Sequence, residues 1–184
     1  MMHSLIILDR DGVINEDSDE YIKSPDEFIP IAGSLGAIAK LNRAGYTIVV
    51  ATNQSGIARG YFDEATLHAM HEKLHAMLAV EGGRIDRIYY CPHGPDNHCD
   101  CRKPKPGLLQ QILKDYPVDP ADTIAIGDSL RDLQAAQAVG ISSLLVRTGK
   151  GKKTETQLEQ DSTLAATPVF DNLSQAVDAL LKKA

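Results

Sequence analysis

The stretch LIILDRDGVIN at residues 5–15 decides the expected fold, because a short apolar run ends in two aspartates separated by one arginine. Four consecutive apolar residues suit a strand that is buried on both faces of a parallel sheet. Asp9 and Asp11 follow at once, and like charges this close raise each other's pKa and resist joint burial. We therefore expect a positive charge to lie between the two carboxylates.

Further apolar runs along the chain alternate with segments of helical period. Asp63 suits the N-cap of the second expected helix, and Pro106 suits the first turn of the third. The alternation predicts an α/β fold in which helices cover both faces of a mostly parallel sheet. The polar segment 148–163 is expected to be a surface excursion, with the basic residues 150–153 as a solvated loop. The expected strands cover residues 4–9, 46–52, 84–90, 122–128 and 141–147, and the expected helices cover 34–45, 63–83, 105–117, 129–140 and 173–182.

Length and composition limit the classes of function. A chain of 184 residues with 43% hydrophobic and 24% charged residues fits one soluble domain that spans residues 1–184. The net charge of −6 gives no general support for binding to a nucleic-acid backbone. No apolar run approaches the roughly 20 residues of a membrane span, and the start MMHS lacks the features of a signal peptide. We therefore expect a cytoplasmic protein that binds neither nucleic acid nor membrane.

Three of the expected strands end in polar residues that suit one kind of chemistry. Parallel strands share one carboxyl edge, so these side chains should converge there, where ligands of such sheets bind. Carboxylates with a hydroxyl and an amide suit a hard cation such as Mg2+, which would also supply the missing positive charge. Each aspartate taken singly has the alternative of a helix N-cap or a turn residue. The converging residues are Asp9, Asp11, Thr52, Asn53, Asp128 and Asp132.

A second group of candidate metal ligands lies in the segment CPHGPDNHCDC at residues 91–101, called the zinc loop below. Four protein ligands leave no position for a reactive water, so a zinc ion here is expected to be structural and to fix the basic residues that follow. His98 is a spare candidate that is expected to face solvent, and unliganded or redox-active cysteines are the alternative. The ligand set of a closed tetrahedral zinc site, three thiolates and one imidazole, is offered by Cys91, His93, Cys99 and Cys101.

Four motifs, in their order and spacing, resemble the haloacid-dehalogenase (HAD) superfamily of phosphatases with an aspartate nucleophile. They are LDRDGVIN, VVATNQSGIARG, CRKPKPG and IGDSLRD, and they lie within residues 5–150. The resemblance implies a three-layer, Rossmann-like sandwich with a small zinc loop and no large cap domain. Within the superfamily, TNQSGIARG and the cysteine loop are similar to phosphatases of small sugar bisphosphates and of histidinol phosphate. A Mg2+-dependent phosphomonoesterase that acts on a small sugar phosphate, as a monomer, is therefore implied.

The resemblance also implies roles for individual residues. Asp9 would attack phosphorus as the nucleophile and form an aspartyl phosphate. Asp11 would protonate the leaving oxygen and later accept a proton from the hydrolytic water. Mg2+ would be held by Asp9, the backbone carbonyl of Asp11 and Asp128. Thr52 and Lys103 would stabilise the transferred phosphoryl group.

The remaining expected site residues would contact the rest of the substrate. The forked guanidinium of Arg102 suits a second anionic or hydroxyl-rich group. Ser129 stands where related phosphatases often have lysine, and Lys105 is expected to be a solvated charge at the start of a helix. The expected substrate-binding residues are Asp17, Ser18, Asp19, Glu20, Tyr21, Asn53, Gln54, Ser55, Arg102 and Ser129.

Other patterns suggest alternatives that the chain supports less well. His68, His71 and His75 have helical spacing, but they lie beside an apolar stripe and are expected to form an exposed polar flank rather than a metal site. A nucleic-acid end phosphatase would share the strand-end aspartates but needs a basic, aromatic surface. A phosphate-binding module without catalysis is the non-enzymatic alternative, and the presence of both Asp9 and Asp11 argues against it.

Overall fold

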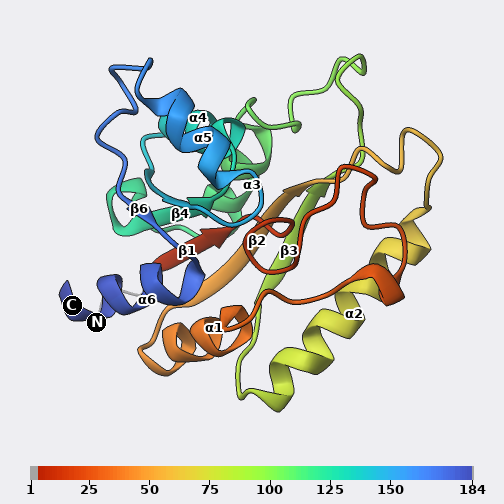
Figure 1. Cartoon of the computed structure of the whole chain (residues 1–184), viewed down its shortest axis with the longest axis horizontal. Coiled ribbons are helices and arrows are strands. Elements are labelled where there is room, and N and C mark those ends of the chain that lie inside the picture. Colours follow the sequence, from red (N-terminus) through yellow and green to blue (C-terminus); the bar gives the residue numbers. More distant parts are fainter. Residues whose placement is uncertain (1–3, 184) are drawn as a thin grey trace.

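The computed structural model describes residues 4–183, which form one parallel sheet between two layers of helices (Figure 1). None of the helices in this described part of the chain has the length and apolar character needed to span a bilayer. The strands are β1 (Leu5–Leu8), β2 (Thr47–Asn53), β3 (Arg87–Cys91), β4 (Thr123–Gly127), β5 (Ser142–Val146) and β6 (Val169–Phe170). The α-helices are α1 (Ser34–Arg43), α2 (Glu64–Val80), α3 (Gly107–Asp115), α4 (Leu130–Ala138), α5 (Gly151–Leu158) and α6 (Leu173–Lys183), with short 3-10 turns η1 (Pro25–Glu27) and η2 (Pro120–Asp122).

Each face of the sheet carries its own apolar core. Ile6 and Leu8 of β1 belong to the core covered by α1, α2 and α6, whereas Leu5 and Ile7 belong to the core covered by α3 and α4. Figure 1 shows these two groups of helices on opposite sides of the sheet. This alternation follows from the two-residue period of a strand, and it explains why β1 is apolar at every position. The expected three-layer α/β fold is confirmed.

The strand order, β3-β2-β1-β4-β5-β6, places the end of β1 at the centre of the sheet. From β1 the chain continues through β2 to β3 at one edge of the sheet, and from β4 it continues through β5 to β6 at the other edge. Leu8 pairs in register with Ile126 of β4, and the backbone N–H of Asp9 donates to the Ile126 carbonyl at 3.0 Å. In sheets of this order, the crevice where the winding reverses is the usual ligand site. Asp9 therefore begins the loop at that crevice.

Helix α5 is the main difference from the sequence-based expectation, because residues 148–163 are not a loop excursion. Gly151 and Leu158 are buried, and Leu158 joins a small apolar cluster with residues of α4 and β5. Thr154 is also buried, and its hydroxyl donates to the carbonyl of Asp128 at 2.7 Å. The helix thus buries a glycine, a hydrogen-bonded threonine and one leucine, which gives almost no apolar periodicity in the sequence.

Two smaller differences concern element boundaries. Strand β6 was not among the expected strands, because two residues are too few to show a periodic pattern; Val169 pairs with Leu145 of β5. Pro106 is the N-cap of α3 rather than part of its first turn. The backbone N–H of Gly107 donates to the Asp100 carbonyl at 2.9 Å, so residues 100–107 form a closed loop and α3 begins at Gly107. Asp63 caps α2 as expected, accepting from the Thr66 N–H.

Candidate active site

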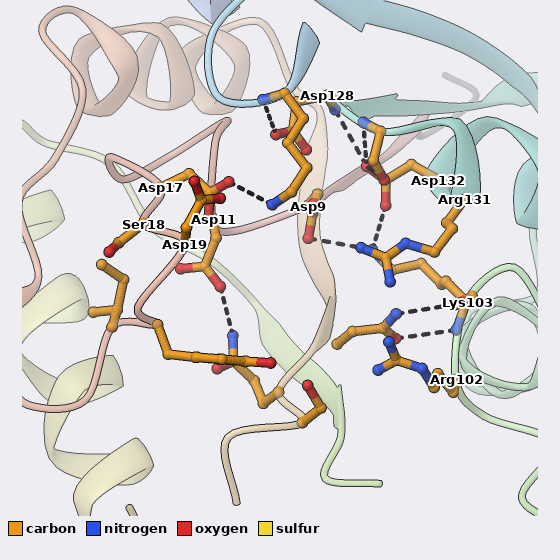
Figure 2. Close-up of a pocket in the computed structure, with 17 residues that line it drawn as sticks. Asp9, Asp11, Asp17, Ser18, Asp19, Arg102, Lys103, Asp128, Arg131 and Asp132 are labelled. Atoms are coloured by element: carbon orange, nitrogen blue, oxygen red, sulfur yellow. Dashed lines mark hydrogen bonds and ion pairs between the residues drawn. The ribbon is translucent and has the colours of Figure 1, made fainter. Parts of the chain in front are cut away.

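A cavity of about 280 Å³ opens at the carboxyl edge of β1, β2 and β4 (Figure 2). The loops that follow these strands and the segment after the zinc loop supply most of its lining. The convergence of strand-end residues that the sequence predicts is therefore confirmed as a geometric arrangement. The residues that line the cavity are Asp9, Asp11, Asp17, Ser18, Asp19, Tyr21, Ile22, Asn53, Gln54, Ser55, Arg102, Lys103, Asp128, Ser129, Arg131, Asp132 and Lys150.

Two expected site residues do not line this cavity. The Thr52 side chain is buried, and its hydroxyl accepts a hydrogen bond from the Gln54 amide at 3.0 Å. The same amide donates to Oδ2 of Asp11 at 2.9 Å, so the Thr52 hydroxyl supports a residue that does line the cavity. Glu20 is exposed on the loop after β1, outside the lining.

The positive charge beside Asp11 is the guanidinium of Arg10, which is completely buried. Its Nη2 and Nε donate to Oδ1 of Asp11 at 2.7 and 3.2 Å, and the Asn15 amide donates to the same oxygen at 2.8 Å. Burial raises the pKa of Asp11, but Arg10 and hydrogen bonds from Asn15 and Gln54 outweigh it and hold the pKa below its usual value. The arginine within DRD thus compensates the charge of Asp11, whereas the sequence predicts Mg2+ as the positive charge between the two carboxylates.

Asp9 has a different environment, since its partner is the ammonium group of Lys103. The Lys103 Nζ donates to Oδ1 of Asp9 at 3.2 Å, to Oδ1 of Asp132 at 2.6 Å and to the Ala51 carbonyl at 2.6 Å. Burial lowers the pKa of Lys103, but the two carboxylates dominate and raise it. Burial and Asp132 raise the pKa of Asp9 to about 7 despite Lys103. The preference for Lys103 over Lys105 agrees with this geometry, because Lys105 is exposed.

The carboxylates of Asp9, Asp128 and Asp132 form a cluster whose ligand atoms all lie within 4.8 Å of one another. Burial, followed by repulsion from Asp9 and Asp132, raises the pKa of Asp128 to about 9. Gly12 lies against this cluster with φ of +85°, and a Cβ there would overlap the Asp128 carboxylate. Oxygen ligands that repel one another in a glycine-lined recess fit a divalent cation such as Mg2+.

Within this cluster, Asp132 is already engaged by protein donors. Its Oδ2 accepts from the backbone N–H groups of Asp128 and Ser129 and from the Ser129 hydroxyl, at 3.0 to 3.2 Å. Its Oδ1 accepts from Lys103. Asp132 therefore closes the capping box of α4 and holds Lys103, while Asp9 and Asp128 keep oxygens available for a cation.

The four predicted zinc ligands come together in the zinc loop. Their ligand atoms lie within 4.8 Å of one another, and all three cysteines are free thiols. Burial raises the pKa of Cys91 to about 12. Three sulfurs and one imidazole gathered around a point fit a tetrahedral Zn2+, whose positive charge would favour the thiolate form of the cysteines. His98 is exposed, as expected.

Three lining residues, Ile22, Arg131 and Lys150, are not among the residues expected from the sequence. Lys150 lies in an exposed turn, as expected, but the sequence does not predict its place in the cavity wall: its Nζ pairs with Asp17 at 2.6 Å, and its backbone N–H donates to Oδ2 of Asp128 at 2.9 Å. Lys150 follows β5, so the strand-end pattern that identified the other loops also applies to VRTGKG. Arg131 lies in the first turn of α4, one turn beyond Asp128.

The loop after β1 carries a strained residue into the cavity wall. Tyr21 has φ of +67°, a conformation that side chains other than glycine and asparagine rarely adopt. Its ring packs near Tyr61, with centroids 5.2 Å apart, and the Arg59 guanidinium lies 5.8 Å from the Tyr21 ring centre. These contacts hold the loop in a fixed position over the cavity, which places Asp17 and Asp19 along its wall.

The expectation that all three helical histidines form an exposed flank is wrong for His71. His68 and His75 are exposed, but His71 is only 6% exposed and its Nε2 lies 3.2 Å from Nη1 of Arg10. Burial and the neighbouring Arg10 lower the pKa of His71 to about 3, so the neutral ring can accept this hydrogen bond. The buried guanidinium needs an acceptor on this side, and α2 provides it.

Comparison with known proteins places these features in a family. A family model described as HAD-hydrolase-like matches residues 100–176. The chain is similar to the D-glycero-beta-D-manno-heptose-1,7-bisphosphate 7-phosphatase of Pseudomonas aeruginosa, with 55% identity over 99% of this chain and 100% of that protein. The Bordetella bronchiseptica protein of the same name is 54% identical over 98% of this chain and 99% of its own length.

A crystal structure of D,D-heptose 1,7-bisphosphate phosphatase from B. bronchiseptica, complexed with magnesium and phosphate, has the same fold. Its TM-score to this chain is 0.93 at 54% sequence identity, over 98% of this chain and 99% of that one. The corresponding phosphatase from Burkholderia thailandensis has a TM-score of 0.75 at 47% identity, over 97% and 98% of the two chains.

Proposed function

Because this chain belongs to the family of D-glycero-beta-D-manno-heptose-1,7-bisphosphate 7-phosphatases, we propose that it removes the 7-phosphate of D-glycero-D-manno-heptose 1,7-bisphosphate. One observation carries the assignment of the chemistry. Asp9 and Asp11 lie side by side in the cavity, but one carboxylate is paired with Lys103 and the other with Arg10. Two carboxylates in different electrostatic environments suit two different roles in phosphoryl transfer.

Asp9 is the proposed nucleophile. A carboxylate oxygen of Asp9 attacks phosphorus, the bond from phosphorus to the sugar oxygen breaks, and an aspartyl phosphate forms. Lys103 lies 3.2 Å from Asp9 and supplies a fixed positive charge beside the transferred group. Preorganised charge of this kind stabilises the transition state, in which negative charge spreads over the phosphoryl oxygens.

Asp11 is the proposed acid and base. It donates a proton to the departing sugar oxygen, and it then accepts a proton from the water that hydrolyses the aspartyl phosphate. The resting site favours the carboxylate form of Asp11, because Arg10 and two side-chain amides bind it. An anionic substrate raises the pKa of a nearby carboxyl group, so substrate binding favours the protonated acid.

Asp9 and Asp128, with the backbone carbonyl of Asp11, are the proposed holders of Mg2+. The cation would screen the repulsion between the Asp9 carboxylate and the incoming phosphate. Support comes from the raised pKa of Asp128 and from the B. bronchiseptica relative, which was crystallised with magnesium and phosphate. Asp132 is proposed to act indirectly, because it orients Lys103 and the turn that carries Asp128.

The zinc loop is proposed to hold a structural Zn2+. Its four protein ligands would complete a tetrahedral shell and leave no position for a reactive water. The loop ends at Cys101, and the next two residues are Arg102 and Lys103, both of which line the cavity. A zinc ion would thus fix the backbone that positions these two cations.

Sugar contacts are proposed for lining residues at the ends of two strands. Asp17, Ser18, Asp19 and Tyr21 lie in the loop after β1, Asn53 is the last residue of β2, and Gln54 and Ser55 follow it. Carboxylates and amides at these positions suit the hydroxyl groups of a sugar. Thr52 contributes by holding Gln54. Glu20 lies outside the lining, and its backbone N–H donates to the hydroxyl of the lining residue Ser18 at 3.1 Å.

The wider setting follows from the same proposal. We propose a cytoplasmic monomer with one domain over residues 1–184, which binds a small sugar phosphate and neither nucleic acid nor membrane. Its product would feed the supply of nucleotide-activated heptose for lipopolysaccharide or other cell-surface glycans. Histidinol phosphate is the alternative substrate, and a comparison of phosphate release from both compounds decides between them.

Substitution of the two strand-end aspartates tests the mechanism. We expect Asp9→Asn to abolish turnover, because no carboxylate oxygen is left to attack phosphorus. We expect Asp11→Asn to lower kcat by about 10²–10⁴-fold, the usual contribution of a general acid and base. With p-nitrophenyl phosphate, whose leaving group needs little protonation, Asp11→Asn should accumulate an aspartyl phosphate that acid quench and mass spectrometry detect on Asp9.

A matched control is Asp178→Asn, which changes a half-exposed aspartate on α6 that pairs with Lys40 and does not line the cavity. This control should retain wild-type turnover. Equal and modest losses in the Asp9 and Asp11 variants would contradict the assignment of nucleophile and acid. Faster release from histidinol phosphate than from the heptose bisphosphate would overturn the substrate assignment but leave the mechanism in place.

A further inference from the structure

Two arginines from separate elements face the same side of the cavity. Arg102 follows the zinc loop, and Arg131 lies in the first turn of α4. Figure 2 shows both side chains on one side of the site, with Asp9 between them and the loop that carries Asp17 and Asp19. The cavity therefore has a cationic wall and an anionic wall on opposite sides of the nucleophile.

The two guanidinium groups have no carboxylate partner in the described structure. Among residues 4–183, none of the ion pairs includes Arg102 or Arg131. Arg102 makes one long hydrogen bond, from Nη1 to the His93 carbonyl at 3.4 Å. Two like charges on one side of the cavity repel each other, so a bound anion would stabilise the pair.

The other two cations of the cavity are already neutralised. Lys103 is paired with Asp9 and Asp132, and Lys150 is paired with Asp17 at 2.6 Å. Ser129 carries no charge. Of the described residues that line the cavity, only the arginine pair is therefore available to compensate a second negative group on a bound substrate.

Substrate geometry then determines which wall receives which group. The proposed substrate carries one phosphate at each end, and the phosphate that reacts must lie at Asp9. Asp19, which belongs to none of the ion pairs among residues 4–183, would repel the second phosphate, and both Asp17 and Asp19 can accept hydrogen bonds from sugar hydroxyls. Arginine guanidinium groups bind phosphate through paired N–H donors, which is the recognition that the opposite wall offers.

This inference rests on the proposed function. We infer that Arg131 is a specificity-determining residue, which forms with Arg102 a two-arginine clamp for the phosphate that is not transferred. Because the clamp contacts the remote phosphate and not the reacting one, its contribution should depend on whether the substrate carries that phosphate.

The test compares two substrates that share the reacting phosphate. Wild-type enzyme, Arg131→Ala and Arg131→Gln are assayed with D-glycero-D-manno-heptose 1,7-bisphosphate and with the 7-monophosphate of the same sugar. Loss of a charged hydrogen-bond donor should lower kcat/KM for the bisphosphate by about 10- to 100-fold, mainly through KM. The loss for the monophosphate should be at least ten times smaller. Arg131→Lys should recover part of the lost preference.

Product inhibition provides a second measurement that does not depend on turnover of a poor substrate. The 1-phosphate product retains the remote phosphate, so Arg131→Ala should raise its inhibition constant about tenfold or more. Inhibition by inorganic phosphate, which competes for the site at Asp9, should change much less. The matched control is Arg43→Ala, an exposed arginine at the end of α1, which should leave all these values unchanged.

The outcomes separate the clamp from the proposed function. If the wild type prefers the bisphosphate and Arg131→Ala keeps that preference, the clamp is wrong while the proposed function stands. Equal losses on both substrates, in Arg131→Ala and Arg131→Gln alike, would also overturn the clamp, since they indicate a general effect on the site. If the wild type releases no phosphate from the bisphosphate, both proposals fail.

Discussion

At the scale of single residues, Arg10 allows two aspartates to end a buried strand. Its guanidinium is completely buried, and Asp11 alone cannot satisfy all of its donors. His71 accepts on the opposite side at 3.2 Å, and the ring of Phe28 lies with its centre 5.4 Å from the guanidinium carbon. A buried charge without such partners would cost several kcal/mol. The position of Asp11 therefore depends on a residue in α2.

The neutral state of His71 predicts a specific dependence of stability on pH. Its pKa is 6.5 when unperturbed and about 3 in the folded protein, so the unfolded chain binds the extra proton between these values. Stability from this residue is present above pH 6.5 and is lost as the pH falls, by about 1.4 kcal/mol per pH unit. We expect His71→Gln, which keeps an acceptor for Arg10 but cannot titrate, to lose less stability on acidification. Urea unfolding between pH 7.5 and 5 measures the difference.

His75 provides the matched control, because it is exposed on the same helix. His75→Gln should keep the wild-type dependence of unfolding free energy on pH. A wild-type pH dependence in His71→Gln as well would show that His71 is not held in the neutral form. The comparison of the two variants removes the contributions of the carboxylates, which all three proteins share.

Strand-end position made some site residues predictable, and the missed ones show its limit. Asp9, Asp11 and Asp128 directly follow strands that are strongly apolar, so topology alone brings them together. The prediction that His71 is exposed is wrong, because helical periodicity places this residue beside the apolar stripe. Periodicity does not reveal that its ring contacts the buried guanidinium of Arg10. Arg131 could not be predicted from a strand end, since it reaches the cavity from within a helix.

At the scale of elements, hydrogen bonds between side chains and the backbone join the zinc loop, and the residues that follow it, to the active site. The Asn53 amide donates to the Lys103 carbonyl at 3.0 Å, and the Lys103 N–H donates to Oδ1 of Asn53 at 3.0 Å. Lys105 reaches back into the loop and donates to the Cys99 carbonyl at 2.8 Å. The loop thus connects β3 to the end of β2, and its shape fixes the backbone at Lys103.

A zinc-ligand variant should therefore impair function through geometry. We expect Cys101→Ser to lower kcat/KM for the sugar bisphosphate by on the order of 10²-fold, because a positioning group displaced by about 1 Å can cost that much. The Mg2+ concentration that half-saturates p-nitrophenyl phosphate hydrolysis should change far less, since Asp9 and Asp128 lie outside the loop. His98→Ala, an exposed substitution in the same loop, should retain both zinc and activity. Equal losses in bisphosphate turnover and Mg2+ affinity would indicate that the loop supports the fold as a whole.

The elements that the sequence predicted well are those with a strong apolar pattern. The apolar runs of the five longer strands located them within a few residues, because they are buried on both faces. Helix α5 escaped prediction because its buried side chains are mainly small or hydrogen-bonded. Thr154 donates to the carbonyl of Asp128, a contact that exists only after β4 and α5 have been brought together. Tertiary structure therefore decides the conformation of this segment.

At the scale of the whole molecule, the strand order determines where the two candidate metal sites lie. The alternation of strands and helices predicts a parallel sheet but not that β1 lies between β2 and β4. This order brings Asp9 and Asp128 together at the reversal of the winding. The zinc loop follows β3 at the edge of the same sheet, so one carboxyl edge carries both an oxygen site and a sulfur-rich site.

These two sites should release their ions under different conditions. Carboxylate oxygens hold Mg2+ weakly, with waters still bound, whereas thiolates and an imidazole hold Zn2+ tightly. We expect brief treatment with dilute EDTA to abolish phosphate release, and added Mg2+ to restore it fully, while elemental analysis finds one zinc per chain throughout. Added Zn2+ should not replace Mg2+ in restoring activity, because the octahedral oxygen site differs from the tetrahedral sulfur site in ligands and geometry. The prediction is that Asp9 and Asp128 form a catalytic metal site that is separate from a structural zinc site in the zinc loop. It would be contradicted if EDTA removed zinc and activity in parallel, or if the purified protein contained no tightly bound zinc.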